Sequence, residues 1–235
     1  MIDAQHSPFP DRSGHGRGLG GRYINYNRMK IKNFIIFTFL SVLLASCRTD
    51  TPNPPYVYEN EPEFTWGYAQ FYGNYYSNYN LNNNVLTLNL FTDGLSVNEN
   101  NELVGTGQYL ILEDVFVAPQ DSVLTAGTYT ISAGGEPLTF FSGIKYEENN
   151  QEVPSGAYIY YIEQDVSKSK IVYIKDGTFT VSRQGISGYS IDCRFVTNEK
   201  TEIKGRFNAN LSFFDESAIP PAPNSAIRHR IKIRR

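Results

Sequence analysis

Histidine is absent from the stretch between Cys47 and Ile227, and this absence excludes several kinds of chemistry. The three histidines of the chain are His6, His15 and His229, which lie near its two ends. Without a histidine, that stretch cannot assemble a Ser-His-Asp or Cys-His nucleophilic site, or a histidine-ligated metal centre. We therefore expect a protein that is not an enzyme.

Cysteine and charge are also scarce. Two cysteines are too few for a disulfide scaffold, and Cys193, in an apolar segment without a neighbouring base, is expected to be a buried small residue. A formal net charge of −3 gives no reason to expect a nucleic acid as partner. Asp93–Asn100 offers oxygen ligands but lacks the alternating acids of a calcium loop. We expect neither a cofactor nor a metal.

Long hydrophobic runs are limited to one, Phe34–Leu44, and it has the features of a secretory signal. Met29, Lys30 and Lys32 precede the run, and small residues follow it. As a helix, such a run spans only about 16 Å, against about 30 Å of hydrocarbon in a bilayer. It therefore predicts a cleaved signal peptide, with Met29 as the initiator and residues 1–28 as an unstructured leader upstream of the true start.

The end of this signal, Leu44-Ala45-Ser46-Cys47, resembles a bacterial lipobox. The resemblance implies that the signal is cut before Cys47 and that the cysteine is acylated, for example with palmitate, so that acyl chains hold the protein on a membrane. The domain boundaries predicted from these features are a leader at 1–28, a signal peptide at 29–46, a lipidated cysteine and tether at 47–62, a β domain at 63–216, and a Pro-rich linker and basic tail at 217–235.

The body contains short β-rich runs separated by turn signals, without a helical period of 3.6 residues. The predicted strands are Phe64–Tyr72, Val85–Thr92, Gly107–Val117, Thr128–Ser132, Leu138–Ile144, Ala157–Glu163, Lys170–Lys175, Thr178–Arg183, Tyr189–Val196 and Ile203–Phe214.

Three turn signals organise the C-terminal half. Asp176-Gly177 between two apolar runs predicts a two-residue hairpin, and 185–188 and 198–200 predict two further turns. Together they predict that the last four strands form a meander. The fold class is therefore all-β, with a single antiparallel sandwich or closed barrel of about 8–10 strands.

Several segments of the body resemble uncharacterised all-β lipoproteins of the Bacteroidales type. The residues that carry the likeness are Tyr72–Tyr76 with the strand that follows it, Ala126–Thr130, Asp176–Val181 and Ile203–Phe207. The resemblance implies a protein anchored to the outer membrane and exposed on the cell surface. It implies no catalytic residues. Asp121-Ser122-Val123 also matches the short sequon for O-glycosylation in such bacteria, which makes Ser122 a candidate modification site.

An aromatic cluster near the start of the body is the best candidate for binding. Phe64, Trp66 and Tyr68 alternate and are expected to lie in the core. The following tyrosines sit among Asn and Ser, and exposed Tyr with Asn neighbours suits stacking on sugars and adaptable hydrogen bonding. We therefore predict a glycan-binding loop with Tyr75, Tyr76, Tyr79, Asn82 and Asn83 as its residues.

Paired carboxylates for a glycosidase are harder to find. Glu113 and Asp114 are neighbours on a predicted strand and are expected to point to opposite faces. Glu163 and Asp165 can share a face but adjoin a polar loop.

The favoured hypothesis is a lipid-anchored envelope protein that binds an extracellular glycan or partner protein. Two alternatives stay open. One is a pilus-like structural or assembly subunit that uses the alternating apolar and basic segment Ile227–Arg235, either as an edge strand or as a strand donated to a neighbour. The other is a lipocalin-like carrier of a small apolar ligand.

Overall fold

The computed structural model describes residues 57–148, 150–164 and 168–218. The leader, the signal segment, Cys47 and the basic tail lie outside the described residues. The described part is all-β and contains no α-helix, which confirms the predicted all-β class. Three short strand pairings are parallel, so the sheet is not antiparallel throughout as predicted. No helix among these residues has the length and apolar character needed to cross a membrane.

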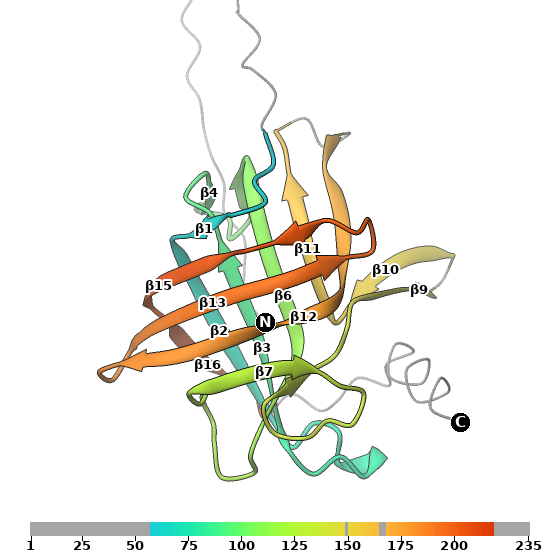
Figure 1. Ribbon diagram of the computed structural model, residues 1–235, viewed down its shortest axis with the longest axis vertical. Helices are drawn as coiled ribbons and strands as arrows, with labels where there is room; N and C mark the ends of the chain where they lie inside the picture. Colours follow the sequence, from blue (N-terminus) through green and yellow to red (C-terminus); the bar gives the residue numbers. More distant parts are fainter. Residues whose placement is uncertain (1–56, 149, 165–167, 219–235) are drawn as a thin grey trace, which may run out of the picture. The chain divides into compact units, whose positions relative to one another are not determined.

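Most strands belong to one sheet (Figure 1). Its members are β1 (Glu63–Phe64), β2 (Trp66–Gly73), β3 (Asn84–Phe91), β6 (Gly107–Val117), β7 (Gly127–Ile131), β8 (Thr139–Phe140), β11 (Ala157–Ile162), β12 (Lys170–Gln184), β13 (Gly188–Thr197), β14 (Glu202–Ile203), β15 (Arg206–Asn210) and β16 (Ser212–Asp215). The 3-10 turn η1 (Ser77–Tyr79) lies between β2 and β3.

Five of these strands close a barrel, because two long strands each pair with different partners at their two ends. The first residues of β6 pair with β11 and its last residues with β8, while β12 pairs first with β11 and further on with β7. β7 and β8 pair with each other and complete the ring. Further strands are bonded outside it: β15 pairs with β13 and β16 pairs with β2, and only Leu211 separates β15 from β16 in sequence.

One hydrophobic cluster forms the main core of the sheet. Its members come from nearly every strand of the sheet, and the largest are aromatic: Phe64, Tyr129, Phe140, Phe179 and Phe195 are 0–1% exposed. The Tyr129 and Phe179 rings stack with centroids 4.5 Å apart. Large aromatic side chains thus occupy the core of the described part. The lipocalin-like carrier, which needs a cavity inside a barrel, stays a hypothesis.

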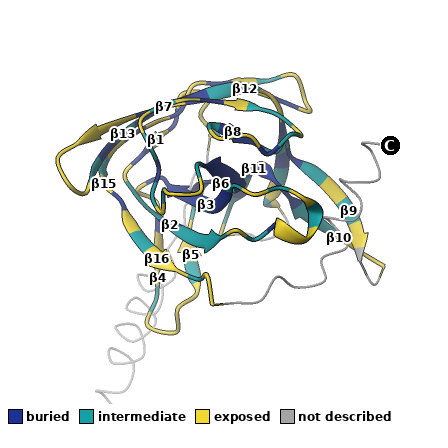
Figure 2. Ribbon diagram, turned by 90° about the horizontal axis from the view of Figure 1, so that it is seen from below, coloured by how far each residue is buried: buried dark blue, intermediate teal, exposed yellow. Residues whose placement is uncertain are grey.

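Two small hairpins stand outside the main sheet. One joins β4 (Leu95–Val97) to β5 (Leu103–Gly105), and the other joins β9 (Ile144–Glu148) to β10 (Gln151–Ser155). The second projects away from the barrel in both views (Figures 1 and 2). The strands predicted from the sequence include neither hairpin.

The structure corrects the predicted hairpin at Asp176-Gly177. β12 runs unbroken through both residues, and the pairing with β13 shifts register between Ile174 and Asp176, so the pair marks a bulge rather than a turn. Gly177 has φ +118, and a Cβ atom there would lie 2.1 Å from the Arg194 carbonyl oxygen. Glycine is needed at this position because the neighbouring backbone leaves no room for a side chain.

Other strand predictions agree with the structure to different degrees. β6 has the predicted bounds, and the turns at 185–188 and 198–200 are confirmed. The meander is β12–β13–β15, with one strand where two were predicted. The strand predicted at 203–214 is divided into β14, β15 and β16, and β16 pairs with β2 instead of joining the meander. The strand predicted at 138–144 is wrong: it is the two-residue β8, and β9 begins at Ile144.

Candidate functional site: a tyrosine groove on the outer face of the barrel

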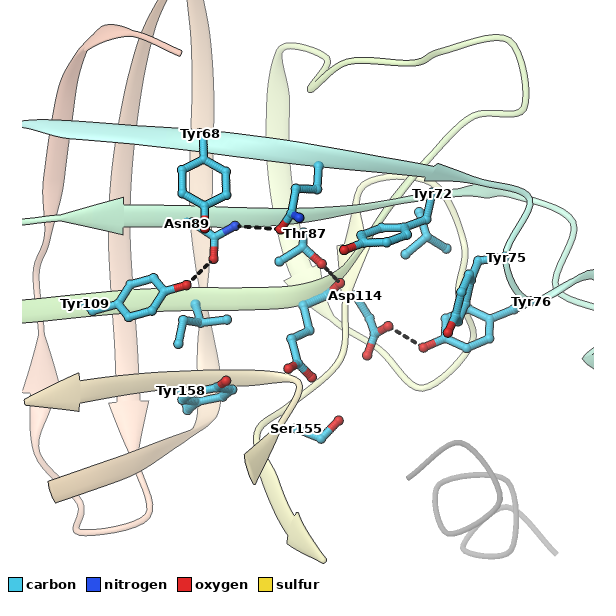
Figure 3. Close-up of a pocket in the computed structure, with 14 residues that line it drawn as sticks. Tyr68, Tyr72, Tyr75, Tyr76, Thr87, Asn89, Tyr109, Asp114, Ser155 and Tyr158 are labelled. Carbon is cyan, nitrogen blue, oxygen red and sulfur yellow. Dashed lines mark hydrogen bonds between the residues drawn. The ribbon is translucent and has the colours of Figure 1, made fainter. Parts of the chain in front are cut away.

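A groove of about 340 Å³ crosses the outer face of the sheet and is rich in tyrosine (Figure 3). We call it the tyrosine groove. It is lined by Tyr68, Gln70, Tyr72, Tyr75, Tyr76, Val85, Thr87, Asn89, Tyr109, Ile111, Glu113, Asp114, Ser155 and Tyr158. Most of these residues belong to β2, β3, β6 and β11.

The groove lies outside the barrel because side chains alternate between the two faces of a strand. On β3, Leu86, Leu88 and Leu90 point into the core, whereas Thr87 and Asn89 between them line the groove. The neighbouring strands are in matching register. Asn89 pairs with Tyr68 on one side and with Ile111 on the other, and Ile111 pairs with Tyr158.

A bulge in β6 brings two carboxylates to the same groove. Leu86 pairs with Val115 and Leu88 with Leu112, so Glu113 and Asp114 both stand opposite the single residue Thr87. An extra residue on one strand breaks the alternation of faces. The expectation that Glu113 and Asp114 point to opposite faces is therefore wrong, because the rule of alternation holds only in a regular strand.

The floor of the groove holds a hydrogen-bonded network. The Tyr109 hydroxyl donates to Asn89 Oδ1, and Asn89 Nδ2 donates to Gln70 Oε1 at 3.4 Å. Burial raises the pKa of Tyr109, and the nearby Tyr68 adds to this. Tyr109 therefore stays a neutral phenol throughout the physiological range of pH.

Glu113 is held by donors from the neighbouring chain segment. The Gly156 N–H donates to Glu113 Oε2 at 2.8 Å, and the Thr87 hydroxyl donates to the Glu113 carbonyl at 2.8 Å. Burial raises the pKa of Tyr158, and the charge of Glu113 and a hydrogen bond with it raise the pKa further. The carboxylate thus has a fixed place between β6 and β11.

Asp114 connects the groove to the loop after β2. The Tyr76 hydroxyl donates a hydrogen bond to Asp114 Oδ1, and both residues are buried, at 4% and 8% exposure. The Tyr76 ring packs in a small cluster with Val85 and Phe116, outside the barrel core. This cluster fixes the loop against the end of the groove.

Of the five residues predicted to bind a ligand, two line the groove and three do not. Tyr75 and Tyr76 line the groove, but Tyr76 is buried rather than exposed. Tyr79 packs against the same small cluster and does not line the groove. Asn82 is exposed, and Asn83 Nδ2 donates to the Gly135 carbonyl at 2.8 Å. The loop therefore supplies one side of the groove.

The prediction of a core position is confirmed for Phe64 and wrong for Trp66 and Tyr68. Phe64 belongs to the separate strand β1 and is 1% exposed. On β2 the inward residues are Ala69 and Phe71, which belong to the core or pack against it, so Trp66 and Tyr68 face outward. The predicted alternation of Trp66 and Tyr68 is correct, but the two residues lie on the outer face of the strand and not on its inner face.

The remaining candidates are placed as follows. Ser122 is exposed between β6 and β7. Cys193 is buried as expected, and burial raises the pKa of its thiol. Within the described ranges, no group of three or more His, Cys, Asp or Glu side chains is placed to hold a metal ion. Cys47, Asp165 and the segment 227–235 lie outside those ranges.

Sequence reasoning missed the greater part of the groove. Tyr68, Tyr109 and Tyr158 come from three strands, and Glu113 was set aside on the rule of alternation. One signal was available. β6 carries apolar or aromatic residues on both faces, which is unusual for a strand of an antiparallel sheet with one face in water.

The chemistry of the lining suits a hydroxyl-rich ligand. Tyrosine rings offer flat apolar surfaces, while their hydroxyls, the amides of Gln70 and Asn89 and the two carboxylates offer fixed hydrogen-bonding groups. The volume lies at the low end of the range for small-molecule sites, about 300–1,000 Å³. The groove is thus a candidate binding site.

Comparisons with protein-family models, with curated proteins and with solved structures find no match to this chain. The class that the structure itself defines is a single β-barrel domain with a polar aromatic groove on its outer face.

Proposed function

We propose that this chain is a lipid-anchored protein of the cell envelope that binds an extracellular glycan in the tyrosine groove and does not chemically change it. The observation that carries the proposal is the groove itself, which combines half-exposed tyrosine rings with polar groups already held by neighbouring residues.

Sugars have an apolar face of C–H groups and a rim of hydroxyls. Tyrosine matches both parts, because its ring packs on the apolar face and its hydroxyl exchanges hydrogen bonds with the rim. The tyrosines of the groove also have few rotatable bonds, and several are held by neighbours such as Asn89 and Asp114. Ordering the site on binding therefore costs little free energy.

Binding of the full chain to a glycan array tests the proposal, with two variants that differ by site. Tyr75→Ala removes a groove ring, whereas Tyr79→Ala removes a ring of the same loop that lies off the groove. We expect Tyr75→Ala to lose about tenfold or more in affinity and Tyr79→Ala to bind as the unaltered chain does. Equal losses in both variants, or none in either, would contradict a site in the groove.

The proposal that binding is not followed by catalysis needs its own test, because the bulge brings two carboxylates together. Hydrolysis of a glycosidic bond uses two carboxyl groups placed about 5–9.5 Å apart on either side of it. Here Asp114 is buried and accepts a hydrogen bond from the Tyr76 hydroxyl, and this hydrogen bond stabilises the loop. We expect oligosaccharides that bind to be recovered intact after long incubation. Release of shorter sugars that stops on Glu113→Gln would overturn this part.

The anchor is proposed from the lipobox at Leu44–Cys47. Labelled palmitate added to cells that express the chain is expected to enter the protein, and Cys47→Ala is expected to abolish both the label and recovery in the outer-membrane fraction. Protease treatment of intact cells tests surface exposure. A body that resists protease until the cells are broken would contradict display on the outer face.

A further inference from the structure

We propose that the ligand of the tyrosine groove bears a positively charged amino group, as in a glycan with free amines. This inference rests on the proposed function and narrows it to one class of ligand.

The charge of the lining is of one sign. Of the 14 residues that line the groove, two are acidic, Glu113 and Asp114, and none is Lys, Arg or His. A cleft lined by one sign of charge attracts ligands of the opposite sign and repels those of its own. An acidic glycan would therefore meet two carboxylates without a basic group of the lining to receive it.

The tyrosines add a second feature that favours a cation. The faces of aromatic rings carry the negative part of a quadrupole, and ammonium groups bind over them. Tyr68, Tyr72, Tyr109 and Tyr158 line the same groove as the two acids (Figure 3). An amine placed in the groove thus has ring faces and a carboxylate within one site.

Glu113 is the residue best placed to receive the amine. It is half-buried, the Gly156 N–H fixes one of its oxygens, and the carboxylate also hydrogen-bonds with Tyr158. These contacts hold a negative charge in place at the groove, and a carboxylate accepts about four hydrogen bonds in total. The tyrosines beside it remain neutral donors and acceptors, because burial raises the pKa of Tyr109 and Tyr158.

Titration calorimetry of the full chain in detergent, with oligosaccharides of equal length, tests the inference. The probes are oligomers of glucosamine, of N-acetylglucosamine and of galacturonate, at a pH where the amines are protonated. We expect glucosamine oligomers to bind about tenfold more tightly than their acetylated counterparts, and galacturonate oligomers to bind most weakly.

Two variants test whether Glu113 causes the preference for amino sugars over acetylated sugars. Glu113→Gln keeps the size of the side chain and an acceptor oxygen but removes the charge, so it is expected to abolish the tenfold preference. Asp192→Asn removes an acid from the outer face of β13 and is expected to leave the preference unchanged. Equal affinity for the amino and acetylated forms, or preference for galacturonate, would overturn the inference while leaving glycan binding intact.

A second probe separates the two proposals if no oligosaccharide binds. Tetramethylammonium chloride carries the charge without a sugar, and the NMR signals of the tyrosine rings report its binding. Shifts of the groove tyrosines that disappear in Glu113→Gln would support the amine site and contradict the glycan. Absence of shifts, together with absence of oligosaccharide binding, would overturn both.

Discussion

β13 and β6 both contribute side chains to the main hydrophobic cluster, yet their outer faces differ. Along β13, inward residues such as Ile191 and Phe195 are buried, whereas Asp192 and Arg194 between them are exposed. Along β6, residues on both faces are largely buried (Figure 2). A barrel of this kind needs only its inner face to be apolar. The second buried face of β6 is therefore an addition to the fold, and it coincides with the tyrosine groove.

The largest loss of stability is expected when a side chain of the inner face is removed. Phe179→Ala removes a ring that is 0% exposed and stacked on Tyr129, so we expect the free energy of unfolding to fall by about 3–5 kcal/mol in urea denaturation. Arg194→Ala, on the exposed face of β13, is the control and is expected to stay within about 0.5 kcal/mol. Similar losses in the two variants would contradict the assignment of inner and outer faces.

A smaller loss is expected at the bulge of β12. In Gly177→Ala the new Cβ would lie 2.1 Å from the Arg194 carbonyl oxygen at φ +118, so β12 and β13 must separate locally, at a cost of about 2–3 kcal/mol. Gly185→Ala also has positive φ but meets nothing within 4 Å, and it is expected to lose only about 1 kcal/mol. Thermal melts of both variants check that Gly177→Ala loses more stability than Gly185→Ala. Equal losses would contradict the bulge at 176–177.

The groove contributes to stability as well as to binding. Tyr76→Phe removes the hydroxyl that donates to the buried Asp114, and we expect a loss of about 1–2 kcal/mol. Tyr79→Phe, in the same loop, keeps the ring and leaves that hydrogen bond in place, and it is expected to change stability by less than about 0.5 kcal/mol. Chemical denaturation distinguishes them, and an unchanged Tyr76→Phe would show that the loop is not held through Asp114.

The smallest effect is expected from the floor of the groove, and it depends on pH. Tyr109→Phe loses the hydrogen bond to Asn89, at about 1 kcal/mol near neutral pH. Burial raises the pKa of Tyr109, so its contribution is complete below about pH 10, the value in the unfolded chain, and declines as the pH rises above it. The difference between the unaltered chain and Tyr109→Phe should therefore shrink above about pH 10. A difference that grows instead would contradict burial of a neutral phenol.

The sequence predicted the fold better than the site, for a physical reason. β6 was placed with its observed bounds because an apolar run ended by turn residues is a local signal. Two wrong predictions, the hairpin at Asp176-Gly177 and the opposite faces of Glu113 and Asp114, both fall at bulges. A bulge forms through the pairing with the neighbouring strand, here β13 in one case and β3 at Thr87 in the other. The sequence of one strand alone therefore does not reveal it.

The groove could not be predicted from the sequence for the same reason, because it depends on how strands pair. Tyr75 and Tyr76 were found because they are close together in sequence. Tyr68, Tyr109 and Tyr158 meet only after β2, β6 and β11 are set in register across the sheet. The side of the sheet that each residue occupies also had to be known, and Trp66 and Tyr68 were assigned to the wrong one.

The most direct test of a ligand site in the tyrosine groove follows the tyrosine rings during ligand titration. The full chain, with its tyrosine rings labelled, is titrated with the glycan that the array selects. A ligand in the groove is expected to shift the NMR signals of Tyr68, Tyr72, Tyr75, Tyr109 and Tyr158, and to leave those of Tyr129 and Tyr189, which lie in the main core, unchanged. Saturable binding that leaves the groove signals unchanged, or that shifts the core tyrosines alone, would contradict a ligand site on the outer face of β6.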